Sequence, residues 1–304
     1  MAITVLVPDD FGMSALAGID GVELVRYHPK QPLPPEADRA QVLIPGFLAQ
    51  RETLELIKRL PGLKLVQLRS AGAELWIGKL PPGVLLSICR GAHGGSTAEW
   101  VIGVLLAIYR ELREFERDRE QRRWHQHVTE TLQGKRILVV GAGDLGQQLK
   151  RRLEPFDAEA TLVGRHRRDG VHGWDELPEL LGRHDAVVLM VPVTSETIGL
   201  ADAAFLARMA DNAVLVNAAR GPVVDTAALV AELNSGRLRA ALDVTEPEPL
   251  PADHPLWTAK NLLLTPHVAG SVAGHEQRSY AVIAGELARF AAGKEPENLV
   301  RGDY

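Results

Sequence analysis

Three segments in the second half of the chain carry side chains suited to proton transfer on a bound anion. "LVNAARGPVVD" places Arg220 beside two alanines and a glycine, and "LLLTPHVAGS" places His267 directly after a proline. "LDVTEPEPL" offers three carboxylates in a proline-stiffened loop, Asp243, Glu246 and Glu248. A protonated imidazole can supply a proton to an oxygen that gains negative charge, and a guanidinium can hold a carboxylate by charge-assisted hydrogen bonds. Each segment follows a strand-like run, where doubly wound sheets place their ligands.

A fourth segment, "RILVVGAGDLGQQL", has the glycine spacing of a loop that holds a dinucleotide. Gly141 would permit a tight turn after the strand, Gly143 would let the backbone approach a pyrophosphate, and Gly146 would let the next helix pack closely on the strand. The free N–H groups at the start of that helix attract phosphates. Because a strand precedes the loop and a helix follows it, we expect dinucleotide binding rather than a purely structural turn.

The acidic residue that usually selects NAD is missing from the end of the second strand of this series. A carboxylate there accepts hydrogen bonds from the ribose hydroxyls, but this strand ends at Gly164 and is followed by "RHRRD". Guanidinium groups in that place can bind a 2′-phosphate. We therefore expect a preference for NADP(H), with NAD(H) as the alternative cofactor; Arg165 is the first candidate, and Arg167 or Arg168 the second. In the competing interpretation "RHRR" is a solvated turn and Asp169 replaces the acid.

Two series of strand-like runs surround these segments. The first is "ITVLV", "VELVRYH", "QVLIP", "KLVQL" and "VLLSI", and the second is "RILVV", "ATLVG", "AVVLMV", "AVLVN", "RAALDV" and "NLLLTP". Helical stretches separate the runs, among them "RETLELIKRL" and "TAALVAELNSG", which ends on Gly236 as a C-cap. This alternation is typical of doubly wound parallel sheets. The fold class that we expect is α/β, with two doubly wound parallel-sheet domains.

A long helix, "STAEWVIGVLLAIYRELREFERDRE", separates the two series and marks a domain boundary. Ser96 or Thr97 can cap it. The last helical stretch, "GHEQRSYAVIAGELARFAAGK", follows the end of the second series, so we expect it to return to the first domain. Residues 1–96 plus 273–304 would then form a smaller, flavodoxin-like substrate domain. Residues 97–272 would form a Rossmann dinucleotide-binding domain inserted into it.

Length and composition disfavour several classes of protein. A chain of 304 residues is long for one hydrophobic core, and 46% hydrophobic with 24% charged residues is an ordinary globular composition. The net charge of −5 disfavours nucleic-acid binding, and the apolar runs fall short of the roughly 20 residues that span a bilayer. The N-terminus lacks a basic region, so we expect a cytoplasmic protein without a signal peptide. The lone Cys89 is expected to be buried, and no spacing indicates a metal site.

These motifs together resemble the D-isomer-specific 2-hydroxyacid dehydrogenase family. "GAGDLG", "NAARG", "DVTEPEP" and "TPHVAGS" match family motifs in the right order, as does the helix around "TAEWVIGVLLAIYREL". The resemblance covers residues 92–284 well and the first ninety residues loosely. It implies an oxidoreductase that transfers a hydride from NADPH to a small 2-keto acid, such as glyoxylate or hydroxypyruvate, and forms a D-2-hydroxy acid.

The resemblance also implies a role for each of the acid–base residues. Arg220 would be the substrate-binding arginine and His267 the acid/base, and both would contact the substrate. Glu248 would be the carboxylate that orients the imidazole, whereas Glu246 would be a loop or surface residue. Asp243 would face the nicotinamide carboxamide. The chemistry is consistent with these roles, because hydride delivery to a keto group develops negative charge on oxygen, which an imidazolium stabilises.

The turn in "QLRSAGAELW" resembles the family loop whose backbone N–H groups hold the substrate carboxylate. Ala71, Gly72 and Ala73 would supply those contacts, and Gly72 would allow close approach. The segment departs from the commoner family pattern at Glu74 and Trp76, where small or amide residues are frequent. That departure leaves the side chain of the substrate open.

The expected cofactor site extends over all the loops that follow the second series of strands. Its residues are Gly141, Gly143, Asp144, Leu145, Gly146, Gly164, Arg165, Arg167, Arg168, Val191, Pro192, Thr194, Asn217, Ala218, Asp243 and Gly270. Two other functions compete with the reductase: a formate- or phosphite-type dehydrogenase, and a dinucleotide-sensing binding protein without catalysis.

The long helix and the connector after it predict a homodimer. The helix from Thr97 has an extensive apolar face, and the connector that contains Trp124 projects from its far end. The family resemblance points the same way, since in some relatives this connector reaches the partner's active site.

Overall fold

The computed structural model describes residues 2–46 and 51–302. The chain divides into two compact units: unit 1 comprises residues 1–93 and 273–304, and unit 2 comprises residues 94–272. Each strand-like run of the sequence forms a strand, and the last helix belongs to unit 1. Within the described residues, no helix is both long and apolar enough to cross a lipid bilayer.

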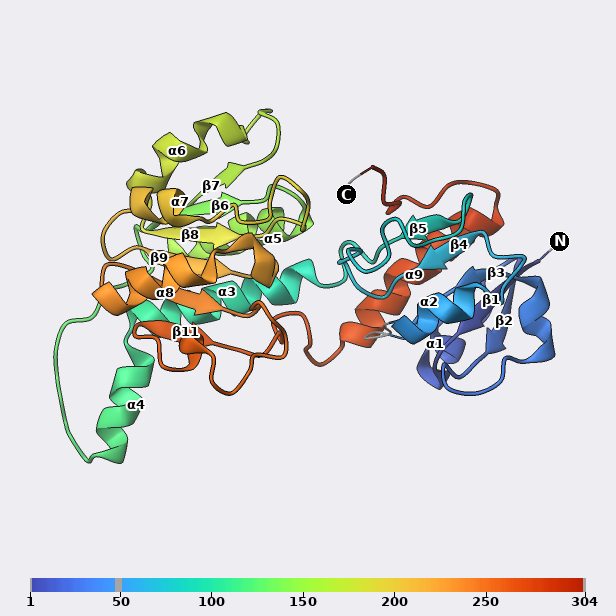
Figure 1. The fold of residues 1–304 in the computed structure, drawn as a ribbon, viewed down its shortest axis with the longest axis horizontal. Helices are drawn as coiled ribbons and strands as arrows, with labels where there is room; N and C mark the ends of the chain where they lie inside the picture. Colours follow the sequence, from blue (N-terminus) through green and yellow to red (C-terminus); the bar gives the residue numbers. More distant parts are fainter. Residues whose placement is uncertain (1, 47–50, 303–304) are drawn as a thin grey trace. The chain divides into compact units, whose positions relative to one another are not determined.

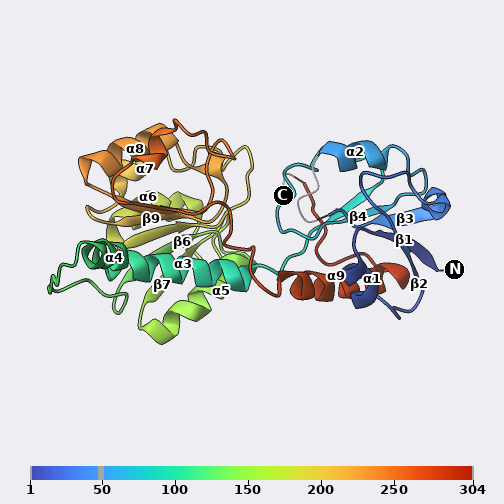
Figure 2. The same ribbon diagram turned by 90° about the horizontal axis from the view of Figure 1, so that it is seen from below.

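Unit 1 is built on a parallel sheet with the strand order β2-β1-β3-β4-β5 (Figure 1). Its strands are β1 (Ile3–Val7), β2 (Val22–Arg26), β3 (Ala40–Leu43), β4 (Leu65–Gln67) and β5 (Leu85–Ser87). Helix α2 (Arg51–Ile57) covers one face, and α1 (Asp10–Ala15) and α9 (His275–Ala291) cover the other (Figure 2). Successive residues of β1 alternate between two cores: Leu6 packs with α2, whereas Val5 and Val7 pack with α9.

Unit 2 contains a longer parallel sheet with the strand order β11-β10-β9-β8-β6-β7. Its strands are β6 (Arg136–Val140), β7 (Glu159–Val163), β8 (Ala186–Leu189), β9 (Val214–Asn217), β10 (Arg239–Leu242) and β11 (Leu262–Leu264). One face packs on α3 (Gly94–Tyr109) and α5 (Asp144–Leu153), and the other on α6 (Leu177–Leu180), α7 (Ala203–Arg208) and α8 (Thr226–Ser235). The order of the strands reverses at β6, whose carboxyl end is therefore the topological switch point where such sheets bind ligands.

Local signals placed some helix ends correctly and one incorrectly. Helix α8 ends on Gly236, which adopts a left-handed φ of 81° as predicted. Helix α3 begins at Gly94, so the expected caps Ser96 and Thr97 lie inside it. Its glycine start packs against α5, because a Cβ at Gly94 would lie 2.3 Å from Oδ2 of Asp144. Tertiary packing therefore extends the helix beyond its local cap signal.

Candidate active site

Two of the three glycines after β6 are required by close contacts, and the third, Gly143, faces open space. Gly141 has a φ of 122°, and a Cβ there would lie 2.3 Å from the carbonyl oxygen of Met190. A Cβ at Gly146 would lie 2.0 Å from the carbonyl oxygen of Gly141, so α5 can approach β6 only with glycine there. Nothing lies within 4 Å of a Cβ at Gly143, the N-cap of α5. The loop is therefore open on the side where the helix N–H groups begin, which suits a pyrophosphate.

Two of the expected arginines lie around Gly164, at the carboxyl end of β7. Nη2 of Arg165 lies 2.6 Å from Oε1 of Glu196 in the loop after β8. Nη2 of Arg168 donates to the carbonyl oxygen of Ala142, in the glycine loop, at 3.0 Å. The guanidinium of Arg168 therefore lies at the glycine loop, and that of Arg165 lies at the next loop of the switch point.

The third arginine, Arg167, contacts a different carboxylate. Nη1 of Arg167 lies 3.5 Å from Oε2 of Glu176, which also accepts a hydrogen bond from Nδ1 of His172 at 2.8 Å. Glu176 is held in turn by the backbone N–H of Gly173. The pKa of the Glu176 carboxyl lies below its usual value, first because of that backbone hydrogen bond and then because of His172. Arg167 is thus engaged in a charge cluster in which Arg165 and Arg168 take no part.

His267 and Glu248 form a hydrogen-bonded pair at the carboxyl ends of β10 and β11. Nδ1 of His267 lies 2.8 Å from Oε2 of Glu248, and Oε1 of Glu248 accepts the backbone N–H of Thr245 at 2.9 Å. Burial would raise the pKa of the Glu248 carboxyl, but the hydrogen bonds from His267 and Thr245 outweigh it, so the pKa lies below its usual value. The side chain therefore stays a carboxylate that can orient an imidazolium. Glu246 is exposed, as Glu248 is.

Buried Asp243 anchors the backbone around His267. Its Oδ1 accepts hydrogen bonds from Oγ1 of Thr265 at 2.6 Å and from the N–H of Val268 at 2.9 Å, and its Oδ2 accepts the N–H of Ala269 at 2.9 Å. The N–H of His267 donates to the carbonyl oxygen of Asp243 at 2.7 Å. The expected contact of Asp243 with a nicotinamide carboxamide stays a prediction. The anchoring contacts are an additional role that sequence reasoning missed.

Arg220 lies on a loop that a buried asparagine shapes. Oδ1 of Asn217 accepts the N–H of Ala219 at 3.0 Å, and its Nδ2 donates to the carbonyl oxygen of Arg220 at 2.9 Å. A Cβ at Gly221 would lie 2.0 Å from the carbonyl oxygen of Thr245, so this loop touches the loop of Glu248. The guanidinium also contributes to the low pKa of the Glu248 carboxyl. The loops that carry Arg220, Glu248 and His267, which are far apart in the sequence, therefore lie together at one edge of the unit 2 sheet.

The expected substrate loop lies in unit 1, directly after β4. Oγ of Ser70 donates to the carbonyl oxygen of Gly72 at 3.0 Å, which closes the turn. Ala73 is buried, and Trp76 is only 6% exposed in the core beneath α2. Trp76 therefore belongs to the core of unit 1. The proposed backbone contacts of Ala71, Gly72 and Ala73 with a substrate carboxylate stay predictions.

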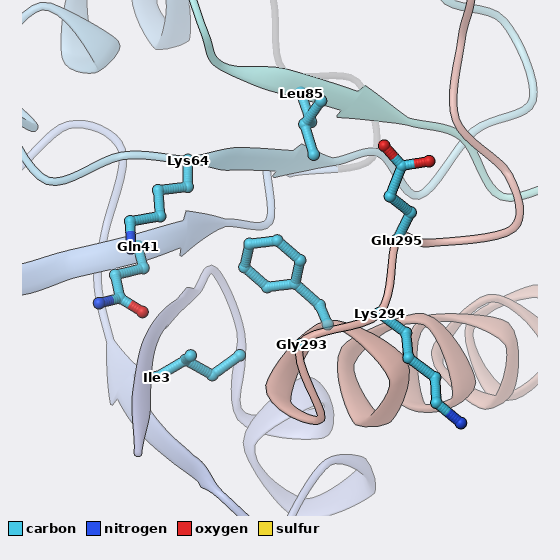
Figure 3. A pocket seen from close by; sticks show the side chains of 8 residues that line it. Ile3, Gln41, Lys64, Leu85, Gly293, Lys294 and Glu295 are labelled. Carbon is cyan, nitrogen blue, oxygen red and sulfur yellow. The ribbon is translucent and has the colours of Figure 1, made fainter. Parts of the chain in front are cut away.

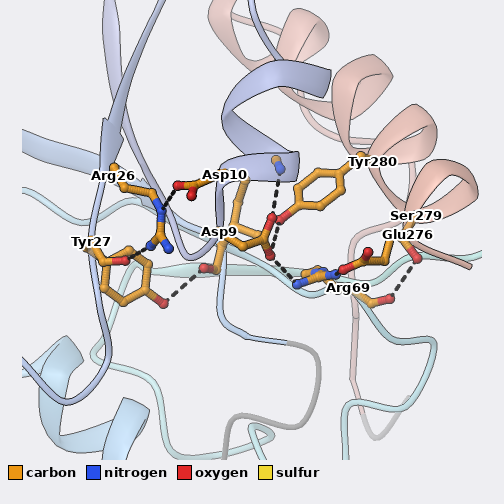
Figure 4. Close-up of polar contacts among 10 residues, drawn as sticks. Asp9, Asp10, Arg26, Tyr27, Arg69, Glu276, Ser279 and Tyr280 are labelled. Carbon is orange, nitrogen blue, oxygen red and sulfur yellow. Dashed lines mark hydrogen bonds and ion pairs between the residues drawn. The ribbon is translucent and has the colours of Figure 1, made fainter.

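A buried charge cluster stands immediately before this loop. Arg69 is 5% exposed; its Nη1 lies 2.6 Å from Oδ2 of Asp9 and its Nη2 lies 2.9 Å from Oε1 of Glu276 (Figure 4). Oη of Tyr280 donates to the same Asp9 oxygen at 2.9 Å, and the Arg69 guanidinium stacks over its ring. Nε2 of His93 is 2.9 Å from the carbonyl oxygen of Arg69. Contacts from three separate segments of the chain therefore fix the start of the loop. No sequence motif indicated this cluster.

Unit 1 contains a cavity of about 290 Å³ (Figure 3). It is lined by Ile3, Gln41, Lys64, Leu85, Phe290, Gly293, Lys294 and Glu295. Ile3 and Leu85 are the first residues of β1 and β5, so the cavity is at the amino ends of the strands. Ligands of such sheets bind at the carboxyl ends, and we therefore do not place the active site there.

Comparisons with known proteins agree with the motifs. Residues 102–269 match the family model of the NAD binding domain of D-isomer specific 2-hydroxyacid dehydrogenases. A glyoxylate reductase from Thermofilum pendens is 33% identical over 269 residues, which are 84% of this chain and 79% of the relative.

Two solved structures share the fold over nearly the whole chain. A D-isomer specific 2-hydroxyacid dehydrogenase from Xanthobacter autotrophicus Py2, in complex with NADPH and MES, is 30% identical with a TM-score of 0.86, over 99% of this chain and 98% of the other. An NADPH-dependent glyoxylate/hydroxypyruvate reductase from Sinorhizobium meliloti, in complex with NADP and sulfate, is 27% identical with a TM-score of 0.83, over 99% and 98%. The expected fold class is thereby confirmed. The chain with this glycine loop and this Arg220, Glu248 and His267 set belongs to the D-isomer-specific 2-hydroxyacid dehydrogenase family.

Proposed function

We propose that the protein reduces small 2-keto acids such as glyoxylate or hydroxypyruvate to D-2-hydroxy acids, and that it prefers NADPH to NADH. The observation that carries the proposal is the His267–Glu248 hydrogen bond with Arg220 beside it, at the carboxyl edge of the unit 2 sheet. The glyoxylate reductase and NADPH-dependent reductase among its relatives support the substrate class.

The residues around the switch point fit a nicotinamide dinucleotide. The open side of Gly143 and the first turn of α5 would hold the pyrophosphate, and Arg165 and Arg168 would hold a 2′-phosphate. When bound, the cofactor supplies the hydride that reduces the keto carbon. No metal is needed to explain the charge that develops on the keto oxygen, because an imidazolium can stabilise it.

The protein groups then hold the substrate and move one proton. Arg220 would bind the substrate carboxylate and keto oxygen by charge-assisted hydrogen bonds, which fixes the orientation of the reacting carbon. Since Glu248 occupies Nδ1 of His267, Nε2 is the nitrogen that remains to give its proton to the keto oxygen. Glu248 stabilises the imidazolium before the transfer and keeps the ring in one orientation.

Steady-state assays test both parts of the proposal. Glyoxylate, hydroxypyruvate and pyruvate are assayed with NADPH and with NADH, and formate and phosphite are assayed in the oxidative direction. We expect turnover with a keto acid and a kcat/KM that favours NADPH by at least about tenfold, the value of one charge-assisted contact. Dinucleotide binding without turnover of any substrate would favour the non-catalytic sensor, and oxidation of formate or phosphite alone would favour that class of dehydrogenase.

A single substitution, Arg165→Ala, tests the cofactor preference separately. Arg165→Ala should weaken the binding of NADPH much more than the binding of NADH, because only NADPH carries the phosphate that the guanidinium would contact. Equal losses for the two cofactors, or equal efficiencies in the wild type, would mean that the arginines form a solvated turn.

A further inference from the structure

An ion pair in unit 2 crosses the end of the strand that carries the glycine loop. Arg165 follows β7 and Glu196 follows β8, and the two side chains meet at 2.6 Å. β7 and β8 are not neighbours in the sheet, because β6 lies between them. The pair therefore connects the two loops on either side of the dinucleotide loop. A guanidinium that would hold a 2′-phosphate already has an anionic partner in this structure.

Glu196 is held in this position by a short, internally bonded loop. Oγ1 of Thr197 is buried, accepts the N–H of Thr194 at 2.7 Å and donates to the carbonyl oxygen of Pro192 at 2.6 Å. The N–H of Glu196 donates to Oγ1 of Thr194 at 3.3 Å. These contacts fix the backbone on both sides of Glu196, which keeps its carboxylate within side-chain reach of Arg165.

We propose that Glu196 competes with the 2′-phosphate of NADPH for Arg165 and so limits the preference for NADPH. The proposal rests on the proposed cofactor preference. A 2′-phosphate carries about −1.5 to −2 charges near neutral pH and displaces a carboxylate with a single charge. Breaking the Arg165–Glu196 ion pair offsets part of the binding free energy that the phosphate gains from Arg165. NADH has a neutral hydroxyl in that place, so its affinity depends little on Arg165 or on Glu196.

Glu196→Gln removes the competing charge and keeps the size of the side chain. The pair is partly exposed, with 55% of the Arg165 side chain and 44% of the Glu196 side chain accessible, so the effect is limited by solvent. We expect the variant to bind NADPH and 2′,5′-ADP about two- to fivefold more tightly, the range of an exposed ion pair. Binding of NADH and 5′-ADP should change by much less. Titration calorimetry measures all four dissociation constants.

Two further variants separate competition from a general change of charge. Glu179→Gln removes another exposed acid, on α6, whereas the ion pair of Arg165 is with Glu196; it should leave the ratio of the NADPH and NADH dissociation constants unchanged. In the Arg165→Ala background, Glu196→Gln should lose most of its effect, because the guanidinium for which it competes is gone. The double-mutant cycle measures that coupling directly.

The outcomes distinguish this inference from the proposed function. If Arg165→Ala weakens NADPH selectively but Glu196→Gln leaves NADPH binding unchanged or weaker, the competition is refuted and the cofactor preference stands. If Glu196→Gln tightens NADPH binding equally with and without Arg165, the effect is repulsion between the Glu196 carboxylate and the phosphate. The competition for Arg165 is then refuted as well. If the wild type and Arg165→Ala both bind NADPH and NADH alike, the cofactor preference and the competition fail together.

Discussion

At the scale of single residues, the proposed reaction depends on a histidine whose backbone conformation is unusual. His267 has a φ of 55°, a left-handed backbone that most side chains disfavour, and its ring is fixed by Glu248. The backbone directly after it, at Val268 and Ala269, is held by the carboxylate of Asp243. The position thus combines a side chain with a proposed function and a local conformation that limits which substitutions can test it.

His267→Asn is the preferred test of the proton donor. Asparagine tolerates the left-handed conformation better than alanine does, so loss of activity would report lost chemistry rather than a distorted loop. We expect keto-acid reduction to fall by at least about 100-fold, the lower range of a general acid's contribution, while NADPH still binds. Steady-state rates and a fluorescence titration of NADPH measure the two quantities. Near-normal turnover would remove His267 from the mechanism.

Glu248→Gln tests the orienting carboxylate through pH. The low pKa of the Glu248 carboxyl keeps it ionised as the pH falls to values below the usual range of glutamate, so the imidazolium keeps its partner in acid. In the proposed mechanism, reduction requires the protonated imidazole and should be lost as the pH rises. Without the carboxylate the imidazolium is less stable, so we expect the alkaline limb of the kcat/KM profile to move to lower pH. An alkaline limb that does not move would assign the role to another carboxylate, with Glu246 next.

At the scale of elements, strand ends bring the site residues together and buried polar side chains hold their loops. Asn217 at the end of β9 shapes the loop of Arg220, and Asp243 after β10 anchors the loop of His267. The end of β7 has a comparable constraint at Gly164. A Cβ there would lie 3.1 Å from Nη1 of Arg168 and 3.2 Å from Cγ1 of Val171, so any side chain at this position meets a guanidinium.

Gly164→Asp is therefore expected to act on the cofactor in two ways. Its carboxylate would repel a 2′-phosphate and would also pair with Arg168, which removes one phosphate ligand. Gly164→Ala is the matched control, because it introduces the same crowding without the charge. We expect the ratio of kcat/KM for NADPH to that for NADH to fall at least about tenfold further in the aspartate variant than in the alanine variant. Equal ratios in the two variants would show that crowding alone governs the change.

At the scale of the whole molecule, we propose a homodimer that covers the connector after α4 (Leu112–Glu120). Trp124 and Val128 on this connector are 95% and 96% exposed, an arrangement that is costly for large apolar side chains in water. A second copy of the chain would bury them. We expect a dimer by light scattering at micromolar concentration, and weaker association when both residues are changed to serine. A monomeric wild type would reject the dimer.

Much of the fold and site could be predicted because its signals are local. Alternating apolar runs marked each strand, Gly236 marked the end of α8, and the types and spacing of Gly141, Gly143 and Gly146 marked the dinucleotide loop. The residues Arg220, Glu248 and His267 carried family motifs that stand at the ends of predicted strands. A parallel sheet brings such ends to one edge, so their meeting followed from the strand assignments.

Contacts between distant segments were decided only by the tertiary structure. Arg69 meets Asp9 and Glu276, which are 60 and 207 positions away, and Arg165 meets Glu196 across the end of a strand that separates them. These partners depend on the order of the strands and on how each loop is held. Neither is encoded in a local period or motif. The sequence by itself determined that arginines replace the usual acid after β7, because residue types are read directly from it. Only the tertiary structure decided that Glu196 pairs with Arg165, because this contact depends on the order of the strands.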